Sequence, residues 1–161
     1  MRIAHDEEMI RAASVLIADR SQFGRRLTRN MLVSLGVRSV IEVADGPAAL
    51  EAVSANKPDV LIVDWDLPIL SGIDVIKRIR SPDAFPHPDL PILMLTMHTE
   101  RRYVVQALGH GANEFLAKPT STIALKDRLI SVLCRRRTMV KLGEFYVPRP
   151  RIWPSQPDSG R

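Results

Sequence analysis

The chain has 161 residues, of which 45% are hydrophobic and 25% are charged, a balance typical of a folded domain in water. No apolar run approaches the roughly 18 to 20 residues that cross a bilayer, and acidic residues interrupt the N-terminus where a secretory signal needs an apolar core. We therefore expect a cytoplasmic protein without membrane contact. The single cysteine, Cys134, excludes an internal disulfide and a cysteine-rich metal site.

The formal net charge of +5 is unevenly distributed along the chain. Residues 135–161 hold seven basic and two acidic side chains, which leaves 16 basic and 16 acidic side chains in residues 1–134. The main body is therefore neutral, and the excess positive charge belongs to a C-terminal tail. We expect no direct DNA binding, since this tail lacks the apolar pattern of a helix-turn-helix unit.

Short apolar runs alternate with helical patterns along the chain. The five runs are Val15 to Ala18, Val40 to Val43, Val60 to Val63, Ile92 to Leu95, and Phe115 to Ala117. The helical patterns that follow them begin near Phe23, Pro47, Gly72, Glu100 and Thr120, and the last is expected to reach Arg137. Continuously apolar strands separated by helices are typical of a parallel sheet with helices on both faces. The pattern predicts an α/β, doubly wound fold.

The polarity of the runs predicts the strand order. The second and fifth runs are the most polar, which suits edge strands and favours the order 2-1-3-4-5. We expect an N-terminal extension over residues 1–13, one domain over residues 14–137, and a proline-rich, basic tail over residues 138–161. The tail is expected to be extended, with Phe145, Tyr146 or Trp153 packing back on the domain. The segment Ser81 to Pro91, with four prolines, is expected to be a loop.

Polar side chains that could react or bind a ligand follow four of the predicted strands. They are Asp19, Asp64, Thr96 and Lys118. In the order 2-1-3-4-5 the first and third strands are neighbours, so Asp19 and Asp64 should meet in one crevice at the carboxyl ends of the strands. As an isolated residue, Asp19 would be interpreted as a helix N-cap.

The stretches VLIADRSQFGRRL, VLIVDWDLPILSGIDVIKRIR, PILMLT and FLAKP resemble the receiver domain of two-component response regulators, from about Ser14 to Arg137. The resemblance implies a flavodoxin-like fold and a signalling switch that is not a turnover enzyme. It implies that Asp64 accepts a phosphoryl group from a histidine kinase or phosphotransfer protein, with Lys118 and Thr96 binding phosphoryl oxygens. It also implies a Mg²⁺ site formed by Asp19, Asp64 and the main-chain carbonyl of Asp66.

Further expectations come from the same resemblance. The Lys118-Pro119 peptide is expected to be cis, and Thr96 and Phe115 are expected to act as switch residues. A downstream protein would bind the face formed by the helix near Glu100, the strand at Phe115 and the last helix, and homodimerisation is an option. Core packing is an equally good interpretation of Phe115.

One residue departs from the family pattern. Receiver domains place a second acid, a direct Mg²⁺ ligand, where this chain has Arg20, and a guanidinium cannot ligate a metal. Arg20 either pairs with Asp64 or turns to solvent. The alternative function is a phosphorylation-independent pseudo-receiver that acts as a protein-interaction module.

A phosphatase of the haloacid dehalogenase type, with Asp64 and Asp66 as nucleophile and acid, is a weaker alternative because Pro68 occupies the position of a required Ser or Thr. The four histidines lack the spacing of metal ligands, so we expect no metal-binding or phospho-relay role for His5, His87, His98 or His110. We interpret Arg25 and Arg26 as solvated helix charges.

Overall fold

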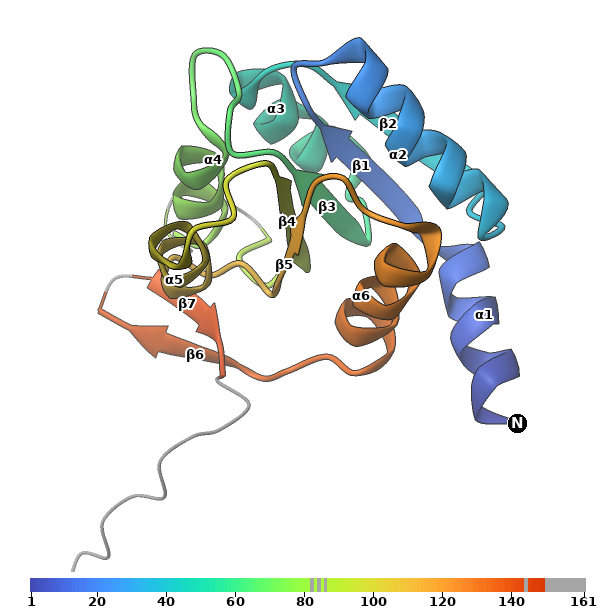
Figure 1. Ribbon diagram of the computed structural model, residues 1–161. Coiled ribbons are helices and arrows are strands. Elements are labelled where there is room, and N and C mark those ends of the chain that lie inside the picture. Colours follow the sequence, from blue (N-terminus) through green and yellow to red (C-terminus); the bar gives the residue numbers. More distant parts are fainter. Residues whose placement is uncertain (82, 84, 86, 144, 150–161) are drawn as a thin grey trace, which may run out of the picture.

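The computed structural model describes residues 1–81, 83, 85, 87–143 and 145–149, and in this part of the chain five parallel strands form one sheet in the order β2-β1-β3-β4-β5 (Figure 1). The strands are β1 (Ser14–Ala18), β2 (Ser39–Val43), β3 (Val60–Val63), β4 (Ile92–Thr96) and β5 (Glu114–Ala117). The helices are α1 (Arg2–Ala12), α2 (Gln22–Ser34), α3 (Gly46–Asn56), α4 (Gly72–Ile79), α5 (Arg101–Gly109) and α6 (Thr122–Cys134). The predicted fold class and strand order are confirmed.

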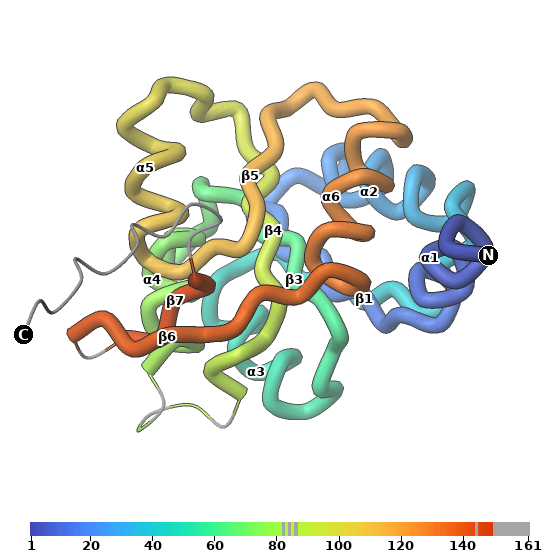
Figure 2. The backbone as a smooth tube through the Cα atoms, turned by 90° about the horizontal axis from the view of Figure 1, so that it is seen from below, coloured from blue at the N-terminus to red at the C-terminus, as the bar shows by residue number. Residues whose placement is uncertain are grey.

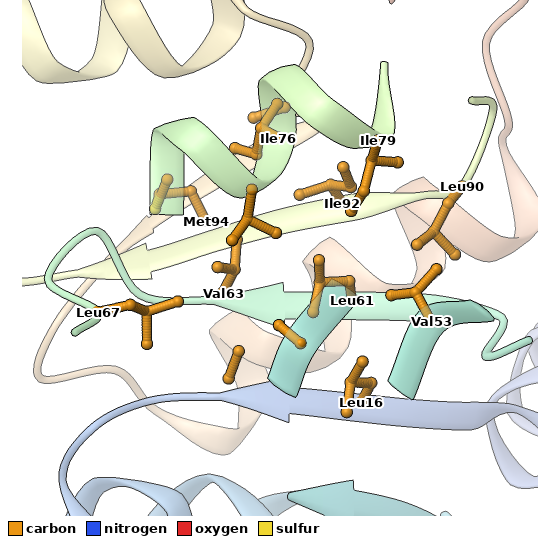
Figure 3. Packing of buried hydrophobic residues seen from close by; sticks show 14 of the residues in the cluster. Leu16, Val53, Leu61, Val63, Leu67, Ile76, Ile79, Leu90, Ile92 and Met94 are labelled. Atoms are coloured by element: carbon orange, nitrogen blue, oxygen red, sulfur yellow. The ribbon is translucent and has the colours of Figure 1, made fainter. Parts of the chain in front are cut away.

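Helices cover both faces of the sheet because alternate residues of the central strands point to opposite sides. Leu16 of β1 and Leu61 of β3 pack with α3, α4 and α5, as Figure 3 shows for the side chains of α3 and α4. Val15 and Val60 point the other way and pack with α1, α2 and α6. The central strands are therefore buried on both sides, and the polar residues that follow them lie at the sheet edge.

Side-chain caps begin four of the helices. Each cap accepts a hydrogen bond from a backbone N–H in the first helical turn, which satisfies a donor that lacks an intrahelical partner. The caps are Ser21 for α2, Asp45 for α3, Ser71 for α4 and Ser121 for α6. Ser21, and not the nearby Asp19, caps α2, so the Asp19 carboxylate is available for other contacts.

The N-terminal extension forms a helix, α1, that packs against α6. Ile10 is 1% exposed in this contact, and the ammonium of Lys126 lies 3.2 Å from a carboxylate oxygen of Glu7. Only Asp6 and Ile10 are buried along the helix, so its sequence carries no long apolar period. Tertiary packing on α6, and not a strong amphipathic pattern, therefore holds α1 in place.

The segment after α6 forms a β-hairpin, so the expectation of an extended tail is wrong for these residues. Strands β6 (Met139–Leu142) and β7 (Phe145–Pro148) pair antiparallel and lie beside the end of α4 (Figure 2). The backbone N–H of Tyr146 donates to the carbonyl of Arg80 at 3.1 Å, and Val147 is buried. Trp153 lies outside the described residues. The last helix ends at Cys134, three residues before the expected end.

A buried arginine fixes the loop after α4. Arg80 is 0% exposed and donates to the carbonyls of Gly111 and Pro88 and to the side-chain oxygen of Asn113, at 2.7 to 3.0 Å. Burial lowers the pKa of Arg80 to about 9, against an opposing effect of Asp89, so the group is charged at neutral pH. Arg80 thus links Pro88, in the segment Ser81 to Pro91 that was predicted to be a loop, to the residues just before β5. Positions 82, 84 and 86 of this segment lie outside the described residues. Over the described part of the chain, no helix has the length and apolar character needed to span a bilayer.

Candidate functional site

Two carboxylates meet at the carboxyl edge of the sheet, as predicted from the strand order. Asp19 directly follows β1 and Asp64 directly follows β3. The backbone N–H of Asp64 donates to Ala18 at 2.9 Å, which continues the pairing of these strands past their ends. The side chains of Asp19 and Asp64 are 5% and 11% exposed. The sheet therefore presents two largely buried acids in one crevice.

Lys118 joins these acids from the end of β5. Its ammonium lies 2.6 Å from Oδ2 of Asp19 and 2.7 Å from Oδ2 of Asp64. The backbone N–H of Lys118 donates to the carbonyl of Thr96 at 2.8 Å, and the Lys118-Pro119 peptide is cis, as expected. Burial by itself lowers the pKa of Lys118, but the hydrogen bonds and charges of the two acids outweigh it and raise this pKa. The ammonium therefore stays charged.

Asp19 is held at every polar atom. Its Oδ1 accepts from the N–H of Ser21 at 2.8 Å, its carbonyl accepts from a guanidinium nitrogen of Arg25 at 2.7 Å, and its N–H donates to Val43. Arg25 also lies 3.8 Å from Glu42 and is only 18% exposed. The interpretation of Arg25 as a solvated charge is wrong, because the long side chain turns back along α2 to the end of β1. The sequence spacing of six residues carries no signal for such a contact.

Two glycines allow the helices beside the crevice to lie close to the acids. A Cβ on Gly24 would lie 2.5 Å from Oδ2 of Asp19, and a Cβ on Gly72 would lie 2.1 Å from the carbonyl oxygen of Asp64. Both distances are far shorter than a carbon–oxygen contact allows. The first turns of α2 and α4 can therefore approach the two acids only because these positions lack a side chain.

Arg20 is exposed and lines the same crevice. Over the described ranges it forms no ion pair within 4.0 Å, either with Asp64 or with another acid. The first of the two expected arrangements, an Arg20–Asp64 pair, is therefore absent from this structure. Lys118 supplies the positive charge between the acids instead.

The remaining predicted residues lie around this centre. Thr96 ends β4 and is 0% exposed, and its hydroxyl accepts from the N–H of His98 at 3.3 Å. Asp66 is exposed, and its N–H lies 3.3 Å from Oδ1 of Asp64. Phe115, in the middle of β5, is half-buried against the core on the α4 and α5 side. Asp64 and Lys118 are therefore brought together, whereas Thr96 and Phe115 lie behind the crevice.

His98 contacts the side chain of Asp66 beside the crevice, a contact that was not predicted from the sequence. Its Nε2 lies 2.8 Å from a carboxylate oxygen of Asp66, and its ring stacks on Tyr103 with centroids 4.5 Å apart. Trp65 meets the edge of Tyr103 at 4.9 Å. His98 lies two residues past the end of β4 and Asp66 lies three residues past the end of β3, and the position of both after neighbouring strands was the available signal. Trp65, His98 and Tyr103 therefore form an aromatic cluster beside Asp66, and none of the three is among the residues that line the crevice.

The crevice is a cavity of about 420 Å³ with an apolar side. On α2, the residues Phe23 and Leu27 follow the four-residue spacing of a helix, and they are 72% and 48% exposed. The helix instead buries Thr28 and Leu32. The lining residues include Asp19, Arg20, Phe23, Leu27, Met31, Asp64, Asp66, Met97, Lys118 and Pro119. The opening thus offers both charges and an apolar surface to a visiting group.

The oxygen atoms at the site suit a hard divalent cation. Mg²⁺ binds through one or two carboxylates and keeps several waters, and Asp19 and Asp64 supply two neighbouring carboxylates. The main-chain carbonyl of Asp66 is a third oxygen on the same loop. Within the described residues no group of three His, Cys, Asp or Glu side chains forms a metal cluster. The residues therefore fit a Mg²⁺ ion that is held by few protein ligands.

Comparison with known proteins identifies the family to which the chain belongs. The response regulator receiver domain model matches residues 15–130. The chain is 33% identical over 121 residues to chemotaxis protein CheY-3 of Vibrio cholerae, covering 75% of this chain and 92% of that protein. It is 37% identical over 120 residues to chemotaxis protein CheY1 of Helicobacter pylori, covering 74% and 95%.

Solved structures agree with this assignment. A putative response regulator from Chloroflexus aurantiacus matches with a TM-score of 0.70 and 33% identity, covering 76% of this chain and 98% of that one. The receiver domain of a sensor histidine kinase from Pseudomonas aeruginosa matches with a TM-score of 0.68 and 28% identity, at the same coverage. That structure is described with a magnesium ion coordinated in the active-site cleft. The present chain belongs to the family of response regulator receiver domains and thus to the proteins of two-component signalling.

Proposed function

We propose that Asp64 accepts a phosphoryl group from a phosphohistidine of a histidine kinase or phosphotransfer protein. The observation that carries the proposal is the position of Lys118, whose ammonium lies between Asp64 and Asp19 at 2.7 and 2.6 Å. A fixed ammonium beside a carboxylate nucleophile stabilises the negative charge of a phosphoryl group during transfer. The apolar cavity wall at Phe23 and Leu27 would contact the donor protein.

The transfer is a displacement at phosphorus. A carboxylate oxygen of Asp64 forms a P–O bond while the P–N bond of the phosphohistidine breaks, and the electron pair of that bond leaves on the imidazole nitrogen. The product is an acyl phosphate. Lys118 then keeps contact with Asp19 and turns a donor toward a phosphoryl oxygen. The Thr96 hydroxyl becomes a further donor if β4 and its following loop shift toward the acceptor.

Asp19, Asp64 and the carbonyl of Asp66 would hold Mg²⁺ in this reaction. When bound, the ion neutralises charge on the phosphoryl oxygens. The two carboxylates are already close together, so ion binding requires no large rearrangement of β1 or β3. Asp19 has its Oδ1 fixed by Ser21, which orients the carboxylate toward Lys118 and the cavity.

The output is a change in protein binding, and we assign the receiver unit to residues 14–137. Phosphorylation would draw Thr96 toward Asp64 and release space for Phe115 in β5. The face of α5, β5 and α6 would then differ between the two states, and the difference in affinity for a downstream protein or a second copy would be the signal. This is a switch in a cytoplasmic pathway and not a turnover enzyme.

The test uses phosphoramidate, a small donor with a P–N bond, on the wild type and on Asp64→Asn. We expect the wild type to gain one phosphoryl group in intact-mass spectra, to lose it in hydroxylamine as an acyl phosphate does, and to show faster labelling with Mg²⁺. Asp64→Asn should stay unlabelled. Equal labelling of the two proteins, or none in the wild type under any condition, would refute the proposal.

A second candidate, the pseudo-receiver, rests on Arg20. A cationic side chain at the crevice disfavours a metal, so the same surface could bind a partner without phosphate. This alternative would be supported if the wild type is never labelled and if the wild type and Asp64→Asn bind the same target protein.

A further inference from the structure

The most informative feature outside the Asp19–Asp64–Lys118 set is Arg20 itself. It lines the cavity that also contains Asp64 and Lys118, and its side chain is exposed. In the part of the chain that the structure describes, its guanidinium makes no hydrogen bond and no ion pair. A charged group with five donors therefore lies at the acceptor without a partner.

The backbone on both sides of Arg20 is fixed. The carbonyl of Asp19, which forms the peptide to Arg20, accepts from Arg25 at 2.7 Å, and the N–H of Ser21 donates to Oδ1 of Asp19 at 2.8 Å. The Cα of Arg20 is therefore held at the cavity wall, whereas its side chain can still change rotamer. Only a rotation about side-chain bonds is needed to turn the guanidinium inward.

The charge of the crevice explains when that rotation becomes favourable. Before transfer, one ammonium faces two carboxylates, and Lys118 already occupies the space between Asp19 and Asp64. The acyl phosphate carries about one and a half to two negative charges at neutral pH, whereas the Asp64 carboxylate that it replaces carried one. The net negative charge of the crevice therefore grows, and it attracts Arg20, which besides Lys118 is the cation among the described residues that line the cavity.

Geometry also favours arginine in this role. The planar guanidinium matches two oxygens of a phosphoryl group with two parallel hydrogen bonds, whereas an ammonium acts as a single point charge. Because such bonds form to the transferring group and not to the resting carboxylates, they lower the barrier as well as stabilising the product.

On the basis of the proposed function, we propose that Arg20 is a phosphoryl-binding residue that partly replaces the charge of the divalent cation. It binds an oxygen of the phosphoryl group on Asp64 during and after transfer. It also repels Mg²⁺ from the two carboxylates in the resting state. The acceptor of this chain is therefore less dependent on Mg²⁺ than one that holds an acid at position 20.

The first experiment measures the initial rate of phosphoramidate labelling in EDTA and in Mg²⁺. We expect the wild type to be labelled in EDTA, and Arg20→Gln to lose about tenfold or more of that rate, the effect of roughly 1.4 kcal/mol of lost stabilisation. In Mg²⁺ the loss should be smaller. Arg20→Lys should fall between the two, because it keeps the charge without the planar fork.

The matched control is Arg26→Gln. Arg26 is an exposed arginine on α2, the helix that begins two residues after Arg20, and it is not among the residues that line the cavity. Its substitution should leave both rates within about twofold of the wild type, since an exposed surface change has little effect on stability. Thermal unfolding followed by circular dichroism verifies that all variants fold.

The second experiment measures Mg²⁺ affinity without any transfer, from the fluorescence of Trp65 next to the acceptor. Arg20→Gln should bind Mg²⁺ more tightly than the wild type, and Arg20→Asp more tightly still, because a cation is replaced first by a neutral group and then by a ligand acid. Affinity equal to the wild type in both variants would overturn the inference.

The outcomes separate this inference from the proposed function. Asp64-dependent labelling that is unchanged by Arg20→Gln in EDTA, or wild-type labelling that occurs only with Mg²⁺, overturns the role of Arg20 and leaves Asp64 as the acceptor. A wild type without labelling in both conditions refutes the acceptor itself.

Discussion

Replacement of Lys118 by methionine tests the charge balance of the crevice. The substitution keeps an unbranched side chain of similar length and removes the cation between Asp19 and Asp64. Since the ammonium lies 2.6 and 2.7 Å from the two Oδ2 atoms, these oxygens are at most 5.3 Å apart. Two unit charges at this separation repel by about 3 kcal/mol at an effective dielectric constant of about 20. Because the acids are only 5% and 11% exposed, water relieves little of this repulsion.

The assay is urea unfolding of the wild type and Lys118→Met at pH 8. We expect the variant to lose about 2 to 3 kcal/mol of unfolding free energy, because the two carboxylates then face each other without a cation between them.

In the wild type the lysine is charged at this pH. The pKa of Lys118 is raised in the folded state, so its stabilising contribution is fully present below the ordinary lysine pKa and is lost only as pH rises through the raised value. Lys126→Met is the control, since Lys126 is 33% exposed beside Glu7 and should cost less than about 1 kcal/mol. A Lys118→Met variant with wild-type stability at pH 8, or one that loses no more than Lys126→Met, would refute the reasoning.

Two further substitutions test how the site is supported. Arg80→Met should lower the free energy of unfolding in urea by about 2 to 4 kcal/mol, because it leaves the carbonyls of Gly111 and Pro88 without their donor. The control Arg78→Met, at an exposed position of the same helix, should lower it by less than about 0.5 kcal/mol. Equal effects would contradict the assigned contacts. Gly72→Ala should lower both the stability and the labelling of Asp64, since its Cβ would lie 2.1 Å from the Asp64 carbonyl oxygen. The control Gly109→Ala, with no atom within 4 Å of its Cβ, should be neutral or slightly stabilising. Unchanged labelling of Gly72→Ala would contradict the close approach of α4.

The sheet and the centre of the site were predictable because both follow from local pattern. Continuous apolar runs such as Val60 to Val63 identify strands buried on two faces, and parallel strands bring the residues at their carboxyl ends to one edge. Asp19 and Asp64 therefore meet although 45 positions separate them. The position of Lys118 followed from the same rule applied to β5.

Helix α1 and the β6–β7 hairpin, which flank the receiver domain, have weaker sequence patterns. Helix α1 buries only Asp6 and Ile10, so no apolar period marks it, and its position depends on contact with α6. The hairpin of β6 and β7 has strands of four residues each. Strands this short gain their stability from docking against α4 and not from their own sequence.

Contacts made by long side chains were the least predictable part of the site. Arg25 and Arg80 appear in the sequence as ordinary helix charges, but one turns back to Asp19 and the other points into the interior. Phe23 and Leu27 show a helical spacing that predicts burial, yet they line an open cavity. Side-chain direction depends on tertiary packing around each helix, and a four-residue spacing alone does not specify which face is covered.

The most direct test of the central claim is to locate the phosphoryl group. The wild type is labelled with phosphoramidate, the acyl phosphate is reduced with borohydride to homoserine, and the modified position is identified by peptide mass spectrometry. The account predicts homoserine at position 64 alone, with its yield strongly reduced in Lys118→Met. Homoserine at position 19 or 66 in place of 64, or its absence from the labelled protein, would contradict the account.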